Sequence, residues 1–310
     1  MNAIRFDAAR VASRSLVGGR LSDPGYRYVR TSLATFRVRV AGHGDDTIVF
    51  SADPPNVIEH ADSLVAELAP HMRVVCFEMP GFGFSRVHRD FRFTLGEMTR
   101  AVRELLEQLA LGPYTLALPC IAGLVAMQLA TDAPALVRRL VTVQTGTWAQ
   151  EVAWARNADP LGVVATPYAG QLLIAAGQNA FARTWYRSAL ANVNDVDRYT
   201  ALALDAYRDG ATYPLASVFQ QLRAAPPTTS LPQIPTLVVW GAADRTHART
   251  DRRTLLRELP HAHTCEFPHS GHFPDLESPR AFAETVRAFV ADPAPARLRS
   301  DAVTRRADGA

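Results

Sequence analysis

The chain has 310 residues, of which 48% are hydrophobic and 20% are charged, the balance of an ordinary globular protein. No apolar run reaches the roughly 20 residues of a membrane-spanning helix, and no apolar signal-peptide core follows the start, so we expect a cytoplasmic protein without a membrane span. All 33 basic residues are arginines, and they are scattered to give a net charge of only +3, which argues against a nucleic-acid partner. The odd set of Cys76, Cys120 and Cys265 fits free thiols in a reducing compartment.

The predicted elements begin with two alternating patterns. Residues 26–33 and 35–42 alternate apolar and polar side chains, as half-exposed antiparallel strands do, and residues 47–51 form a continuously apolar run typical of a buried strand. Further strand patterns cover 73–79, 114–118, 140–144, 236–241 and 263–267, and helical patterns cover 57–69, 94–111, 122–133, 249–259 and 278–291. This alternation predicts an α/β fold, with helices on both faces of a mostly parallel sheet.

One long interval breaks the alternation. Residues 147–230 are rich in Ala, Tyr and Trp and read as several helices, so we expect a helical cap inserted into a core formed by residues 1–146 and 231–290. Residues 291–310 contain almost no large apolar side chains, and we expect this tail to be disordered.

A single cysteine lies where the strand pattern of "YTLALPCIAGLVAMQLA" (114–130) gives way to a helix. A nucleophile elbow needs this context: a strand, a sharp turn that carries the nucleophile, and a helix that begins at once between small residues. Asp244 follows the strand 236–241, and His272 follows the strand 263–267 in a loop that contains Gly271. The chain order Cys120, Asp244, His272 is the order in which such an elbow requires its nucleophile, acid and base.

Four stretches together resemble the α/β-hydrolase fold superfamily: "RVVCFEMPGFGFS" (73–85), "TLALPCIAGLVAMQLA" (115–130), "IPTLVVWGAADRTH" (234–247) and "FPHSGHFPDLESPRAF" (267–282). The resemblance implies an eight-stranded sheet, an elbow after the fifth strand and a substrate pocket between core and cap. It also implies catalytic roles for Cys120, Asp244 and His272.

The sequence departs from the pattern of that superfamily at two places. The elbow pattern Gly-x-Ser-x-Gly is replaced by residues 118–122, "LPCIA", so cysteine stands for serine and both glycines are larger. The position after the third strand, which usually supplies a backbone N–H to the oxyanion, aligns with Pro54, which has no N–H. The backbone N–H of Ile121 would still serve as the second oxyanion donor. If the loop shifts, Asp53 or Asn56 could supply the first donor in place of Pro54.

Other residues are candidates for the substrate pocket. The bulky side chains of the cap and of the loop after Asp244 could contact an apolar substrate: Trp148, Tyr168, Trp185, Tyr186 and His247. No metal-ligand spacing and no phosphate-binding glycine loop is present in the sequence, so we expect no metal and no cofactor.

The chemistry of a Cys–His–Asp set favours acyl transfer, thioester or ester cleavage, or cyclisation on a hydrophobic acyl substrate, either free or bound to a carrier. The missing oxyanion donor supports an alternative, in which His272 shuttles protons in an elimination, decarboxylation or ring closure. A second alternative is a ligand-binding protein without activity. The sequence does not indicate the oligomeric state.

Overall fold

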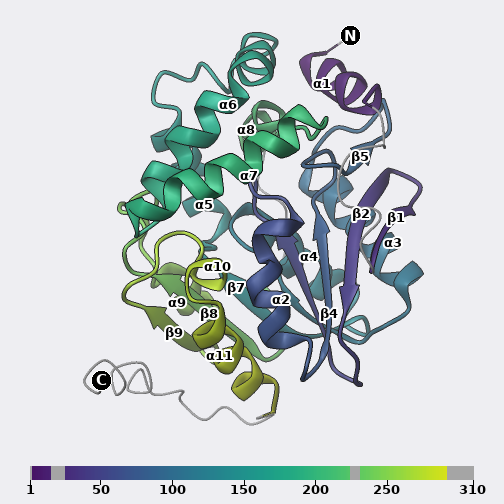
Figure 1. Ribbon diagram of the computed structural model, residues 1–310, viewed down its shortest axis with the longest axis vertical. Coiled ribbons are helices and arrows are strands. Elements are labelled where there is room, and N and C mark those ends of the chain that lie inside the picture. Colours follow the sequence, from purple (N-terminus) through teal and green to yellow (C-terminus); the bar gives the residue numbers. More distant parts are fainter. Residues whose placement is uncertain (1, 15–24, 224–230, 292–310) are drawn as a thin grey trace.

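The computed structural model describes residues 2–14, 25–223 and 231–291, and its centre is one sheet of nine strands (Figure 1). Eight strands follow the order β1-β2-β4-β3-β6-β7-β8-β9, and β5 pairs with β2 beside this path. β2 pairs in antiparallel fashion with β1, β4 and β5, and the remaining pairs are parallel. The strands are β1 Tyr26–Arg30, β2 Ala34–Ala41, β3 Thr47–Ala52, β4 Arg73–Glu78, β5 Arg86–Val87, β6 Tyr114–Ala117, β7 Val137–Val143, β8 Thr236–Gly241 and β9 His263–Phe267.

The burial of these strands follows the patterns that predicted them. β3, β6 and β8 are buried over nearly their whole length, as continuously apolar runs should be. β1 and β9 lie at the two edges of the sheet; the exposed side chains of β9 alternate along the strand, whereas those of β1 are Arg27 and Arg30. The predicted mostly parallel α/β sheet is therefore confirmed, and the two-residue strand β5 is an addition to the eight expected strands.

Helices cover both faces of this sheet. On one face α2 (Asp62–Leu68), which follows the 3-10 turn η1 (Ile58–Ala61), and α11 (Pro279–Ala291) pack against a shared apolar cluster. On the other face lie α3 (Leu95–Leu109) and α4 (Ile121–Asp132). The remaining helical segments of the core are α1 (Ala3–Ala12), α9 (Thr254–Glu258) and α10 (Pro274–Glu277). In the described ranges, no helix combines the length and the apolar character that crossing a membrane requires.

Several helices differ from the sequence predictions: α10 was not predicted, the predicted helix over 57–69 is divided into η1 and α2, and two further differences have a local physical reason. α1 was not predicted, although the Asn2 side chain caps it by accepting the N–H of Arg5 at 2.9 Å. The predicted helix over 249–259 shortens to α9, because the Asp251 carboxylate accepts the N–H of Arg253 at 3.0 Å. Such local side-chain-to-backbone bonds compete with helical hydrogen bonds and favour a turn.

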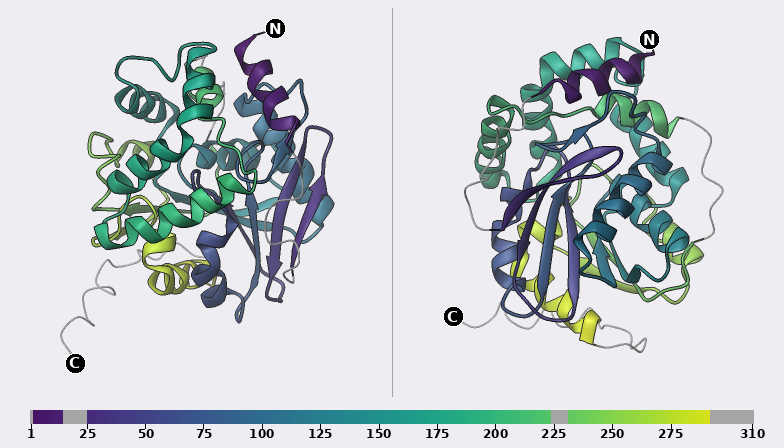
Figure 2. Two further views of the ribbon diagram at one scale, coloured as in Figure 1. Left: turned by 45° about the horizontal axis from the view of Figure 1, so that its top comes forward. Right: turned by 90° about the vertical axis from the view of Figure 1, so that its right-hand side faces the viewer.

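Four helices between β7 and β8 form the cap, and they lie at the end of the sheet where the parallel strands finish (Figure 2). They are α5 (Trp148–Ala158), α6 (Ala169–Ala189), α7 (Val196–Arg208) and α8 (Leu215–Leu222), with the short 3-10 turn η2 (Val193–Asp195) before α7. Trp154 of α5 contacts Trp185 of α6 and Phe219 of α8 edge-to-face, with ring centroids 5.8 Å apart in both pairs, so aromatic contacts join these three cap helices. Residues 224–230 of the expected cap lie outside the described residues. So does the expected disordered tail, apart from its first residue, which ends α11.

The close approach of α4 to the loop after β7 depends on a glycine, and this generates a prediction. A Cβ at Gly123 would lie 2.6 Å from Cγ2 and 2.8 Å from Cβ of Thr145. We expect Gly123→Ala to lower the free energy of unfolding by about 1–3 kcal/mol, the usual cost of overpacking. Urea unfolding would measure this change. Gly96→Ala is the matched control, because Gly96 lies in α3 with open space around it and should keep or gain up to about 1 kcal/mol. Equal stability of the two variants would contradict the close packing at the elbow.

Candidate active site

The candidate site is formed by the loops that follow β3, β6, β8 and β9. These strands, with β7, are neighbours in the parallel part of the sheet, so the loops at their carboxyl ends meet at one edge. The loops carry, in chain order, Asp53, Cys120, Asp244 and His272. Residues separated by more than 200 positions are thereby brought into contact beneath the cap.

Cys120 occupies a sharp turn between β6 and α4. Its backbone has φ +52° and ψ −133°, a conformation that costs a residue other than glycine about 1–3 kcal/mol. The turn is fixed because the Cys120 N–H donates to the carbonyl of Val143 at 2.8 Å, while the Thr145 hydroxyl donates to the carbonyl of Cys120 at 3.1 Å. α4 begins at the next residue, and Cys120 lines the cavity described below.

Asp244 and His272 are paired and buried. The Nδ1–H of His272 donates to Oδ2 of Asp244 at 2.8 Å, and the same oxygen accepts Nδ1–H of His247 at 2.9 Å and Nε2–H of Gln144 at 2.6 Å. Burial alone would raise the pKa of Asp244, but the charge of His272 and the hydrogen bonds from both histidines lower it well below its usual value. Asp244 is therefore a carboxylate that orients His272.

The second nitrogen of His272 contacts Asp53. Nε2 lies 2.9 Å from Oδ2 of Asp53, and a carboxylate can only accept, so Nε2 carries a proton. With both nitrogens donating to carboxylates, His272 is an imidazolium. Burial opposes this charge, yet the charge of Asp244 and the hydrogen bonds to Asp244, Asp53 and Cys120 raise the pKa of His272 well above its usual value.

The Cys120 thiol lies beside this pair but is not ionised. A carboxylate oxygen of Asp53, the sulfur of Cys120 and a ring nitrogen of His272 all lie within 4.8 Å of one another. Burial and the negative charge of Asp53 raise the pKa of the Cys120 thiol to about 12, and His272 offsets this only in part. At neutral pH the elbow therefore presents a neutral thiol next to an imidazolium.

The loop after β3 does not supply the missing oxyanion donor through Asn56. The N–H of Asn56 donates to the carbonyl of Asp53 at 2.9 Å, and its side-chain oxygen accepts the hydroxyl of Tyr186 at 2.8 Å. Pro54 lines the cavity and has no N–H to offer. Asp53 reaches the site with its carboxylate. Ile121 also lines the cavity, and as the first residue of α4 it has a backbone N–H without an acceptor inside the helix.

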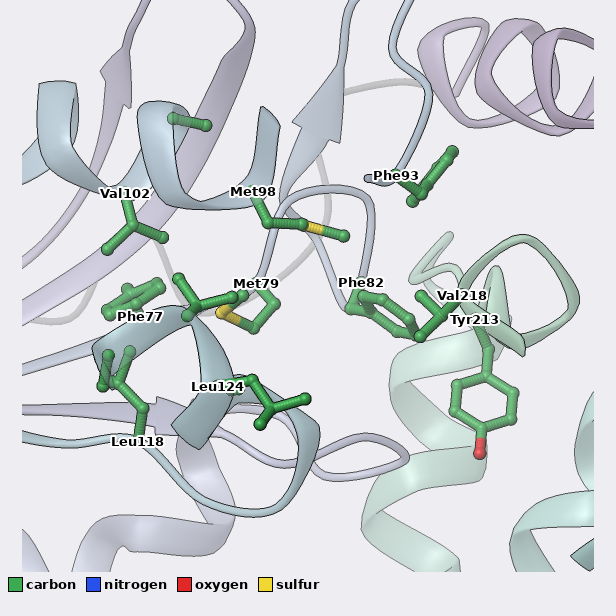
Figure 3. Close-up of a cluster of buried hydrophobic side chains, with 14 of the residues drawn as sticks. Phe77, Met79, Phe82, Phe93, Met98, Val102, Leu118, Leu124, Tyr213 and Val218 are labelled. Carbon is green, nitrogen blue, oxygen red and sulfur yellow. The ribbon is translucent and has the colours of Figure 1, made fainter. Parts of the chain in front are cut away.

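A cavity of about 530 Å³ lies between core and cap, and it receives Asp53 and Cys120. Most of its wall is apolar; Figure 3 shows Met79, Phe82, Met98, Leu124 and Val218 of this wall beside the deeper core residues Phe77 and Leu118. A site with this volume and these walls suits a hydrophobic small molecule.

The structure places two of the five predicted pocket residues in the cavity wall, Trp148 and Trp185. Tyr168 is 45% exposed and lies beside the ring of Phe6 instead. Tyr186 of the cap helix α6 is fully buried, and its hydroxyl donates a hydrogen bond to Asn56.

His247, the fifth of these residues, is also buried and does not line the cavity. Its ring is stacked between those of Trp154 and His272, with centroid distances of 5.4 and 5.0 Å. His247 therefore affects the site indirectly, by donating a hydrogen bond to Asp244 from outside the cavity.

Sequence reasoning missed Glu151 of α5, which has no exposed surface. Its Oε1 accepts the N–H of Gly146 at 2.7 Å, Oε2 has no hydrogen-bond partner among the described residues, and burial raises its pKa to about 7. Three potential metal-ligand atoms lie within 4.8 Å of one another: the sulfur of Cys120, a carboxylate oxygen of Glu151 and a ring nitrogen of His247. Such a thiol–carboxyl–imidazole set is of the kind that could hold zinc. No local pattern distinguishes Glu151 from a surface glutamate, so its burial could not be predicted.

Comparisons with known proteins agree with this architecture. A Pseudomonas aeruginosa protein described as a "putative epoxide hydrolase" superimposes with a TM-score of 0.71 at 23% identity, over 86% of this chain and 96% of that one. The enol-lactonase of Burkholderia xenovorans LB400 (20% identity) and the bromoperoxidase of Bacillus anthracis (15% identity) each give a TM-score of 0.66, over 86% of this chain and 100% of theirs. The sequence pattern of the alpha/beta hydrolase fold matches residues 55–279, and the chain belongs to this family.

Proposed function

We propose that the protein is an enzyme that transfers a proton on a hydrophobic small molecule, with Asp53 as the group that contacts the substrate. One observation carries this proposal: Asp53 stands between His272 and the cavity, with its carboxylate 2.9 Å from Nε2. The side chain of Asp53 is 12% exposed and lines the cavity, whereas that of His272 has no exposed surface. The proton-shuttle role that the sequence analysis considered for His272 therefore passes in part to Asp53.

The chemistry that fits is removal of a proton from a carbon next to a carbonyl group. Asp53 takes the proton, and the electron pair of the C–H bond moves to the carbonyl oxygen. Ile121 lines the cavity, and its backbone N–H, which has no acceptor inside the helix, could stabilise that oxygen. Asp53 exchanges this proton with water and then delivers a proton to another carbon in an isomerisation, or to the leaving group in an elimination, so Asp53 ends as a carboxylate. The imidazolium of His272 donates a hydrogen bond to Asp53, which positions this carboxylate and balances its negative charge.

A second candidate is acyl transfer or hydrolysis through Cys120, His272 and Asp244. The strained turn at Cys120 favours it, because the thiol is presented at the tip of an elbow that opens into the cavity. In the hydrolytic version water accepts the acyl group, and the structures that this chain resembles include an enol-lactonase. This candidate requires Asp53 to leave Nε2, His272 to lose a proton, and the thiol to ionise against a pKa of about 12.

Substitution at the two cavity-lining groups distinguishes the candidates. Proton transfer predicts that Asp53→Asn lowers the rate by about 10²–10⁴-fold, because the base is lost, while Cys120→Ala keeps it within a few-fold. The measurement is deuterium uptake from D₂O into a panel of C8–C12 ketones and β-hydroxy ketones, followed by mass spectrometry. Loss of uptake in Cys120→Ala but not in Asp53→Asn would overturn the proposal. A single acyl adduct on Cys120 after reaction with p-nitrophenyl decanoate, absent in His272→Gln, would establish the second candidate.

The protonation of the thiol gives an independent prediction. Since the pKa of Cys120 is raised to about 12, its alkylation by iodoacetamide should be slow at pH 7–8 and should still be rising at pH 10. Asp53→Asn removes a negative charge beside the thiol, so alkylation at a given pH should become faster. Peptide mass spectrometry would follow Cys120, with free cysteine, whose pKa is about 8.5, as the reference. Half-maximal reactivity below pH 8 that Asp53→Asn leaves unchanged would instead indicate an activated nucleophile.

A further inference from the structure

Within the part of the chain that the structure describes, the exposed lining residues of the cavity mark where it opens to solvent. Six of the lining residues are exposed, and they come from the end of α5, from α6 and from the loop after β8: Asn157, Ala158, Thr184, Arg245, Ala248 and Arg249. The rest of the lining is buried or half-buried. The opening is therefore framed by these three segments, and a ligand enters between them.

The charge of this opening is positive. Its two charged residues are arginines, Arg245 and Arg249. The one carboxylate of the described lining, Asp53, is half-buried and does not belong to the opening. α6 carries two more arginines and no acidic residue along its 21 positions. The nearby Asp251 is already paired with Arg257 at 2.6 Å, so it does not neutralise the opening.

The two arginines of the opening differ in how they are held. Arg245 donates to the carbonyl oxygens of Arg187 and Leu190 at 2.5 and 2.8 Å, which fixes its position without neutralising its charge. The guanidinium of Arg249 has no ion pair and no hydrogen bond with any residue that the structure describes. One fixed and one unengaged guanidinium at the same opening suit a carboxylate or phosphate, which accepts two parallel N–H bonds from arginine.

We propose that the ligand of this cavity is an amphipathic anion, whose carboxylate or phosphate is bound by Arg245 and Arg249 at the opening while its apolar body fills the interior. The interior supports the second half of this assignment, because it is walled by Met79, Phe82, Met98, Leu124 and Val218. The reacting end of the molecule then reaches Asp53 and Cys120. That last step rests on the proposed function, whereas anion binding at the opening does not.

The test uses three C10 probes that share one apolar chain: decanoate, decyl phosphate and 1-decanol. Their binding to the full chain can be followed by quenching of Trp148, Trp154 and Trp185, which line the cavity, and by calorimetry. We expect at least one of the two anions to bind about tenfold or more tightly than decanol, since a charge-assisted hydrogen bond contributes about 1.5–3 kcal/mol. Whichever anion binds more tightly identifies the head group as carboxylate or phosphate.

Substitutions assign the effect to the opening. Arg249→Gln should weaken binding of the preferred anion about tenfold and leave decanol unchanged, and because the Arg249 side chain has no hydrogen bond or ion pair to lose among the described residues, the variant should fold normally. Arg245→Gln should act in the same direction. Arg27→Gln is the control, because Arg27 is an exposed arginine on the edge strand β1 and does not line the cavity. Decanol affinity equal to that of both anions, absence of binding by all three probes, or an unchanged anion affinity in Arg249→Gln would overturn the inference.

The failure of the proposed function can be told apart from the failure of this inference. Asp53→Asn should keep or increase anion affinity, because it removes a negative charge from the cavity and leaves both arginines intact. If Asp53→Asn retains deuterium uptake while Arg249→Gln loses anion affinity, the catalytic role of Asp53 is wrong and the anion site stands. If Asp53→Asn loses deuterium uptake while Arg249→Gln binds the anion as tightly as wild type, the anion site is wrong and the catalytic role of Asp53 stands.

Discussion

A buried imidazolium held between two carboxylates is the interaction on which the rest of this site depends. His272 has no exposed surface, and an unmatched charge at such a position would cost several kcal/mol. Asp244 and Asp53 each accept one of its N–H groups, at 2.8 and 2.9 Å. Asp244 needs partners of its own, which Gln144 and His247 provide from the loops after β7 and β8. The loops after four parallel strands, β3, β7, β8 and β9, must therefore meet at one edge of the sheet. The strand order β3-β6-β7-β8-β9 brings these loops together.

The same arrangement explains why the elbow cysteine differs from a serine nucleophile in the same turn. A nucleophile at Cys120 would need Nε2 of His272 as its proton acceptor, but Asp53 already occupies that nitrogen. The carboxylate also opposes a second negative charge nearby, and it contributes to raising the pKa of the Cys120 thiol. Since Pro54 offers no N–H for an oxyanion, three features of one small region point away from acylation and toward proton transfer.

The sequence predicted those parts of the site that depend on strand order. The elbow at Cys120 and its partner His272 follow strands whose carboxyl ends must meet in a parallel sheet, so their meeting could be anticipated. The role of Asp53 could not be, because it depends on where a side chain turns within its loop and on a contact across 219 positions. Aromatic composition likewise did not distinguish the cavity wall from the cap surface or the cap core. Tyr168 lies on the cap surface and Tyr186 in the cap core, since neither residue type nor helical spacing specifies which face meets the cavity.

The distribution of charge within the cavity orients a ligand before any reaction begins. A carboxylate on the ligand would be repelled by Asp53 in the interior and attracted by Arg245 and Arg249 at the opening. Both effects favour the same orientation, with the anion outward and the opposite end against Asp53 and Cys120. A neutral apolar molecule lacks this bias and can enter either way round. Since proton abstraction requires the reacting carbon within hydrogen-bonding reach of the base, the arginines at the opening would raise the fraction of bound molecules that are placed to react.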